Sequence, residues 1–168
     1  MLKKFIPPKW LPLLQFFIGS ATISQILRLI RLSMQFELKL PLLGFESIKE
    51  MTLTKIDDIF MQLENVSSDK KPSFTLINPF ALKPYEIDIP ESIQNLLEIT
   101  EASNILIFNI VVIQTPLDKS TINFVAPIIF NTDNKTMAQT ILDGKAAAEH
   151  GMAECISDFM QQNESKDA

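Results

Sequence analysis

The run from Asn104 to Ile113 constrains the fold of this chain more than any other segment. After Asn104 every residue of the run except Asn109 is apolar, so an extended strand here would be apolar on both faces. A strand of this kind needs cover on both sides, as in the centre of a sandwich or barrel. If Asn109 is buried, its amide needs hydrogen-bond partners, and we expect a satisfied core asparagine, not a ligand site.

Shorter apolar segments on both sides of this run predict a domain built mostly of strands. The further expected strands are Gln35–Leu40, Met51–Thr54, Ser73–Ile77, Tyr85–Ile89, Thr121–Phe130 and Thr136–Leu142. Pro127 should force a bulge or an edge position in its strand. Helices are expected over Ile56, Ile59, Phe60 and Leu63 behind a Thr54 N-cap, over Pro90–Ile99, and more weakly over Ala146–Met160. Because the strands cluster and do not alternate with helices, the predicted fold class is mostly β: an antiparallel pseudo-barrel with two or three peripheral helices.

Charge divides the chain into two unequal parts. Residues 1–33 contain five of the 15 basic residues and no acidic residue, so the remaining part carries ten basic side chains and all 20 acidic ones. An acidic body is repelled by phosphate backbones and attracted to basic protein surfaces. We therefore expect no direct binding of nucleic acid.

Residues 1–33 allow three interpretations. Met34 opens a segment that already has the pattern of a domain start, which favours a mis-assigned start codon upstream of it. The uncharged run Trp10–Leu27 behind three lysines also fits a signal peptide or membrane anchor. Ile23, Ile26, Leu27 and Ile30 recur at helical spacing beside Arg28 and Arg31, which fits a basic amphipathic arm. The expected organisation is thus an extension over 1–33, a β domain over 34–160 and a frayed tail over 161–168.

The residue types that carry most catalytic and metal chemistry are scarce. Cys155 is the only cysteine and His150 the only histidine, which excludes a disulfide framework and a histidine- or cysteine-rich metal site. The four glycines lie too far apart for a phosphate loop. We expect His150 at the surface or in a turn, no cofactor, no metal, and a binding module in place of an enzyme. A small-ligand β-barrel and a membrane-tethered adaptor using residues 1–33 remain the alternatives.

Several segments resemble the FliW family of flagellar assembly factors. The match covers about Met34 to Leu142, and its first part runs from Phe36 through the turn Leu43-Gly44-Phe45-Glu46. Its most specific part is Thr121–Asn131, which is similar to the family signature Asn-Leu-x-Ala-Pro-Ile-x-x-Asn with Phe124 in place of leucine.

This resemblance implies a cytoplasmic protein with two protein partners, flagellin and the RNA-binding translational repressor CsrA. In the family scheme, flagellin holds the factor until it is exported, and the released factor then binds CsrA and relieves repression of flagellin synthesis. We select Asn78, Asp118, Asn123 and Asn131 as candidate partner-binding residues at the surface. The other interpretation of the signature is core packing, with Ala126 and Pro127 marking a bulge.

Overall fold

The computed structural model describes residues 33–67 and 69–159. The three interpretations of residues 1–33 and the expected frayed tail over 161–168 lie outside the described residues, except that Ser33 already belongs to the first strand.

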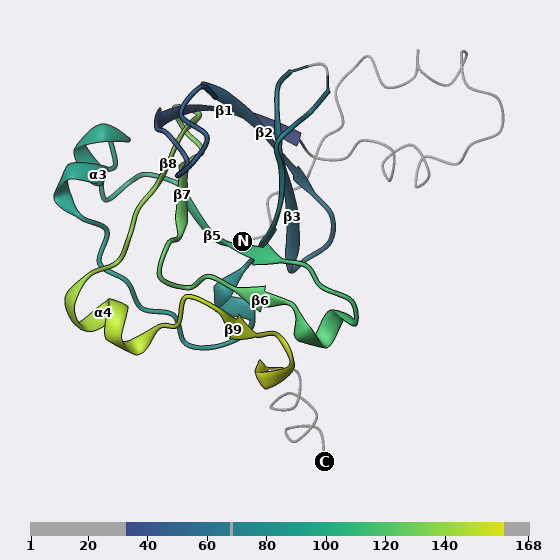
Figure 1. The fold of residues 1–168 in the computed structure, drawn as a ribbon. Helices are drawn as coiled ribbons and strands as arrows, with labels where there is room; N and C mark the ends of the chain where they lie inside the picture. The colour runs from purple at the N-terminus through teal and green to yellow at the C-terminus, as the bar shows by residue number, and fades with distance from the viewer. Residues whose placement is uncertain (1–32, 68, 160–168) are drawn as a thin grey trace, which may run out of the picture. The chain divides into compact units, whose positions relative to one another are not determined.

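Seven of the described strands close into a barrel (Figure 1). Around the ring they are β4 (Ser73–Ile77), β3 (Phe60–Asn65), β2 (Glu50–Lys55), β1 (Ser33–Leu40), β8 (Thr136–Gln139), β7 (Ile128–Asn131) and β5 (Ile105–Val112), and the pairing of β4 with β5 closes it. Two short strands, β6 (Thr121–Ile122) and β9 (Glu154–Cys155), extend the sheet from β5. The predicted mostly-β pseudo-barrel is confirmed.

One pairing in the ring is parallel. Glu37 lies opposite Thr136 and Leu38 opposite Met137 in the parallel β1–β8 ladder, whereas the other ladders are antiparallel. The cause is parity, because strand directions cannot alternate around a closed ring with an odd number of members. A purely antiparallel seven-stranded barrel is therefore impossible, and the parallel contact falls where the first strand of the barrel meets the last.

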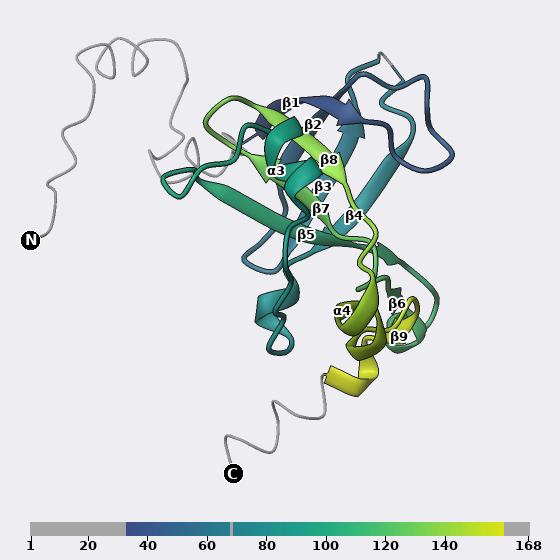
Figure 2. The same cartoon turned by 90° about the vertical axis from the view of Figure 1, so that its left-hand side faces the viewer.

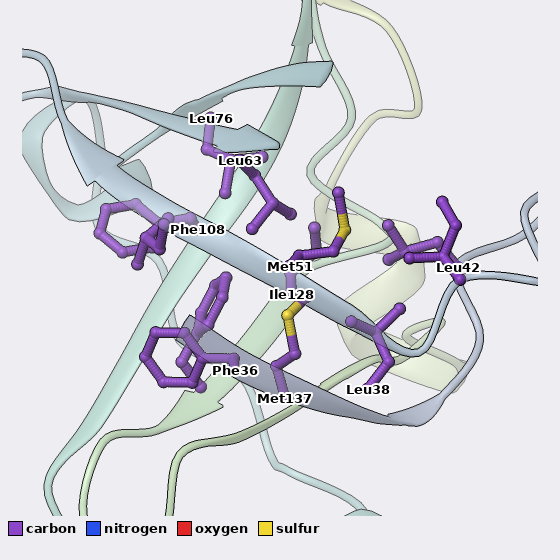
Figure 3. Packing of buried hydrophobic residues seen from close by; sticks show 12 residues of the cluster. Phe36, Leu38, Leu42, Met51, Leu63, Leu76, Phe108, Ile128 and Met137 are labelled. Atoms are coloured by element: carbon purple, nitrogen blue, oxygen red, sulfur yellow. The ribbon is translucent and has the colours of Figure 1, made fainter. Parts of the chain in front are cut away.

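Apolar side chains fill the inside of the barrel. Phe130 lies at the centre of this core, with its ring edge-on to Phe36 at 4.9 Å and to Phe108 at 6.0 Å between centroids. Figure 3 shows the packing of this cluster, whose buried members are Phe36, Leu38, Leu42, Ile48, Met51, Leu53, Leu63, Leu76, Phe108, Ile128, Phe130 and Met137.

A second layer covers part of the outside of the barrel (Figure 2). Ile93 of helix α3 (Glu91–Leu96) and Leu97, the residue that caps its C-terminal end, pack with Ile129 of β7 and Ala138 of β8. Helix α4 (Gly144–Glu149) and strand β9 lie at the other end of this layer. The remaining described elements are the short turns η1 (Pro79–Ala81) and η2 (Leu117–Lys119). The layer explains why β5 is apolar on both faces. Leu106, Phe108 and Ile110 join the barrel core, while Ile105, Ile107 and Val111 face the outer layer.

The helix expected around Ile56–Leu63 is wrong, because this segment is the β2–β3 hairpin. Ile56 and Ile59 lie in the exposed turn, and only Leu63 enters the barrel core. Asp57 does not begin a helix; its Oδ1 accepts hydrogen bonds from the backbone N–H groups of Ile59 and Phe60, at 2.8 and 2.7 Å. An aspartate that binds its own backbone two and three residues on stabilises a turn, so local turn chemistry and strand pairing outweigh the helical spacing.

Three further elements differ from the expectation. Residues 84–90 form no strand, although their side chains still alternate between buried and exposed. Thr121–Phe130 is interrupted between β6 and β7, as a proline without an N–H group requires. Ala146–Met160 contains the end of α4 and the short strand β9 in place of one continuous helix.

Candidate protein-binding site

The signature segment Thr121–Asn131 is mainly structural. Ile122, Phe124 and Ala126 are buried, and so is every residue of β7. Asn131 is only 1% exposed; its Nδ2 donates to the Leu97 carbonyl at 2.9 Å and its Oδ1 accepts from the Asp133 N–H at 3.1 Å. Its amide therefore ties the end of α3 to the barrel. The expected surface position of Asn131 is wrong, and core packing accounts for this part of the signature.

The other three selected residues occupy separate turns. Asn78 is half-buried and caps η1, because its Oδ1 accepts from the Phe80 N–H at 3.1 Å. Asp118 is exposed in the first turn of η2. Asn123 is half-buried, and its Oδ1 accepts from the Val125 N–H at 3.2 Å. Among the described residues, no hydrogen bond or ion pair joins any two of the four selected positions, so the structure does not bring them together as one site.

A buried polar cluster surrounds Tyr85, a residue that was expected only to line a strand. Its hydroxyl donates to the Phe124 carbonyl at 2.6 Å. Asn109 is fully buried as expected, and its Nδ2 donates to the Asn123 carbonyl at 2.7 Å and to the Tyr85 hydroxyl oxygen at 3.4 Å. Burial raises the pKa of Tyr85 to about 12, with the Asn109 hydrogen bond acting in the opposite direction. This cluster joins β5, the signature and the 84–90 segment.

His150 packs against this cluster and does not lie free at the surface. Its ring centroid is 4.7 Å from that of Tyr85 and 6.4 Å from that of Phe124. Both ring nitrogens are buried and make no hydrogen bond to the described part of the protein. The sequence expectation of a surface or turn residue holds only in that His150 directly follows α4.

An ion pair holds the C-terminal part of the outer layer. Lys83 Nζ lies 2.8 and 2.9 Å from the two carboxylate oxygens of Glu154, and 4.0 Å from the centroid of the Phe124 ring. Glu154 Oε1 also accepts from the Gly151 N–H at 2.6 Å. The two charged side chains are 71 positions apart in sequence, so no local pattern could have indicated the contact.

Beside the Tyr85 cluster lies an open groove, which we call the acidic groove. Its volume is about 380 Å³, and it is lined by Phe80, Tyr85, Glu86, Ile87, Asp88, Ile107 and Glu149. The lining combines three carboxylates with apolar and aromatic side chains. One sequence signal points to it: between Lys83 and Lys119 the chain contains six acidic residues and no lysine or arginine. This combination suits contact with another protein better than catalysis, since interface cores favour aromatic and apolar groups within a polar rim.

The described part of the chain brings together no group of three or more His, Cys, Asp and Glu side chains that could hold a metal ion. Within the same residues, no helix has the length and apolar character that crossing a bilayer requires.

Comparison with known proteins identifies the family. A family model described as "FliW protein" matches residues 27–151, which is most of the chain. The chain belongs to the FliW family. The resemblance inferred for residues 34–142 is thus confirmed, and the match extends beyond that range at both ends.

Individual FliW relatives agree with this assignment. "Flagellar assembly factor FliW 2" of Wolinella succinogenes is 49% identical over 130 residues, covering 77% of this chain and 95% of the relative. "Flagellar assembly factor FliW" of Sulfurimonas denitrificans is 52% identical over 129 residues, covering 77% of this chain and all of the relative. A crystal structure of the flagellar assembly factor FliW superimposes with a TM-score of 0.65 at 26% identity, covering 72% of this chain and 84% of that one.

Proposed function

We propose that this FliW-family protein is a cytoplasmic flagellar assembly factor that acts by binding two proteins, flagellin and the translational regulator CsrA. In this role it covers flagellin before export. When flagellin is exported, the factor binds CsrA and relieves the repression of flagellin synthesis by CsrA. The observation that carries the proposal is the identity of about half of all residues with flagellar assembly factors over nearly their whole length.

The barrel interior supports a binding role at the surface over a small-ligand site inside. Twelve buried apolar residues fill the described interior, and Ile48 is the only one of the twelve that lines any of the three described grooves. Barrels that hold small ligands keep an internal cavity with a few polar groups directed into it. The alternative of a small-ligand barrel therefore has little structural support. The alternative of a membrane-tethered adaptor depends on residues 1–33, outside the described part.

The surface offers different chemistry to the two partners. An apolar patch of Leu40, Leu43 and Ile141 is 42%, 65% and 57% exposed and borders a groove of about 230 Å³. Such a patch can bind the apolar face of a helix. In our proposal, helical terminal segments of flagellin present this face to the patch. The acidic body, in contrast, suits a basic RNA-binding protein such as CsrA, since opposite charges speed association. Asn78, Asp118 and Asn123 remain our proposed contact residues near the turns.

Isothermal titration of the full chain against flagellin and against CsrA, each at low and high salt, tests the proposal. Apolar contact is only weakly screened, so flagellin binding should fall little with salt. CsrA binding should fall more steeply, because attraction between net charges steers that encounter. Absence of binding to both proteins at micromolar concentration would contradict the proposed function and leave the family assignment intact.

A further inference from the structure

The 84–90 segment leaves its backbone unpaired beside the acidic groove. After Lys83, whose N–H donates to the Pro79 carbonyl, the next backbone group in a backbone hydrogen bond is the Pro90 carbonyl, which accepts from Ile93 and Gln94. In between, only the Ile89 carbonyl has a partner, the side-chain amide of Gln94 at 2.7 Å. Figure 2 shows this stretch leading up to α3. The N–H and C=O groups of Glu86, Ile87 and Asp88 thus have no partner among the described residues.

The side chains of the same segment alternate as in a strand that lies on a core. Tyr85 is buried, Ile87 and Ile89 are half-buried, and Glu86 and Asp88 are exposed. Anchoring through the inward residues holds the segment against the barrel, while its outward side chains stay accessible. An unpaired backbone of this kind is a template on which a second extended chain can pair.

The charges along the groove indicate which side chains a partner should carry. Glu86 and Asp88 form no ion pair with any described residue, and the nearest basic residue in sequence, Lys83, is already bound to Glu154. Glu149 adds a third carboxylate to the lining, and Phe80, 54% exposed, adds an aromatic face. An occupant therefore gains most by carrying cationic side chains next to apolar ones.

We infer that the acidic groove binds an extended protein segment of alternating basic and apolar residues, which adds as a strand beside residues 85–89. Its N–H and C=O groups pair with those free backbone groups of Glu86–Asp88 that face it, because successive residues of an extended segment direct their N–H and C=O groups to opposite edges. Its basic side chains reach the carboxylates of Glu86 and Asp88, and its apolar side chains cover Ile87, Ile107 and Phe80. The inference deepens the proposed function and rests on it only in taking a protein as the physiological partner.

The test uses the full chain and a capped peptide of about six residues, the usual length of a strand, in which lysine and valine alternate. Titration should shift the amide resonances of residues 85–89 in a heteronuclear NMR spectrum. Two further peptides test the chemistry. One replaces lysine by glutamate, and the other carries N-methyl groups on two adjacent amides, one of lysine and one of valine, so that either edge of the peptide loses an N–H donor while the side chains are kept. Both should bind at least about tenfold more weakly, since each lacks one of the two contributions.

Matched variants test the location. The double substitution Glu86→Lys with Asp88→Lys should weaken peptide binding by about tenfold or more, because it reverses the charge facing the occupant. The control, Glu98→Lys with Glu101→Lys, makes the same change of net charge at exposed positions of the same acidic run that do not line the groove. It should bind within about threefold of the unaltered chain, because exposed distant charges are screened.

Several results would overturn the inference. These are equal losses in both double variants, equal binding of the N-methylated peptide, and shifts centred on the Leu40–Leu43–Ile141 patch. A dimer of this chain that blocks the peptide would mean that the groove receives a second copy instead. Titrations with CsrA and flagellin on the same proteins separate the two proposals. If the unaltered chain binds neither partner, the proposed function fails whatever the peptide does. If it binds a partner while the groove variants retain full affinity for the peptide, the present inference fails.

Discussion

At the scale of single residues, Asn109 shows how one amide joins two layers of the protein. It is the one polar side chain within the apolar run of β5, and it points away from the barrel core towards Tyr85 and the Asn123 carbonyl. Its Oδ1 is buried and has no partner among the described residues. An amide fits this place because its nitrogen donates, whereas a carboxylate can only accept.

We therefore expect Asn109→Asp to destabilise the fold at neutral pH. The substitution removes the donor to the Asn123 carbonyl and places a carboxylate at a fully buried position. The free energy of unfolding should fall by about 3 kcal/mol, as measured by urea denaturation. Gln114→Glu, at an exposed position after β5, is the control and should change it by less than about 0.5 kcal/mol. An unchanged midpoint for Asn109→Asp would show that the side chain is solvated.

Burial of the Tyr85 hydroxyl should make the folded protein less stable at alkaline pH. Burial raises the pKa of its hydroxyl from 10.0 to about 12, so the folded state keeps a proton that the unfolded state has already lost. The contribution to stability is full below pH 10 and should disappear as the pH rises towards about 12. Because Tyr85 is the only tyrosine, tyrosinate absorbance follows its titration directly. Tyr85→Phe should remove this component of the pH dependence; ionisation near pH 10 in the folded protein would contradict the burial.

At the scale of elements, the C-terminal strand β9 depends on one long-range contact. Within the described residues its one strand partner is the two-residue strand β6, and the ladder between them joins only two residue pairs. The Lys83–Glu154 pair supplements it; these side chains are 17% and 26% exposed, so the pair is screened less than a surface pair. The contact also places the ammonium over the Phe124 ring.

Glu154→Gln should loosen this element first. The change keeps the size of the side chain and removes the charge that Lys83 needs, so we expect a loss of about 1–2 kcal/mol. Hydrogen exchange should quicken at the Phe124 and Ile156 amides, which bond to Gly151 and Ser120 around β9. Asp58→Asn is the matched control, because the Lys55–Asp58 pair is 47% and 95% exposed and should contribute little. Equal effects of the two changes would mean that the Lys83–Glu154 pair contributes no more to stability than an exposed ion pair.

At the scale of the whole molecule, the barrel is a packed core that supports the outer binding surfaces. Phe130 of β7 contacts Phe36 from β1 and Phe108 from β5, so it connects three strands of the ring, one of them about 90 positions away in sequence. Close-packed protein interiors tolerate little loss of side-chain volume.

Phe130→Ala should accordingly destabilise the whole barrel. Removing a fully buried ring typically costs about 3–5 kcal/mol, because contacts are lost and a cavity remains. Thermal denaturation should show one transition at a lower midpoint, not separate unfolding of the outer layer. Leu43→Ala, at a side chain that is 65% exposed, should leave the midpoint nearly unchanged and serves as the control.

Sequence patterns correctly predicted those strands and helices that form because of residues within the segment itself. The run of β5 required cover on both faces, and the barrel core and the outer layer provide it. The strands β1, β2 and β4 and the helix after Pro90 were predicted from alternation, propensity and the proline itself. The resemblance carried by Thr121–Asn131 identified the family, although Asn131 proved to be buried.

Tertiary structure decided what depends on residues far apart in the chain. The spacing of Ile56, Ile59 and Leu63 fits a helix, but pairing of β3 with β2 and β4 selected the hairpin. The parallel β1–β8 contact follows only once the ring closes with seven members. The acidic groove likewise forms only when the 84–90 segment, β5 and α4 meet. Local periodicity determines which face of a segment is apolar, whereas only packing determines which other segment covers it.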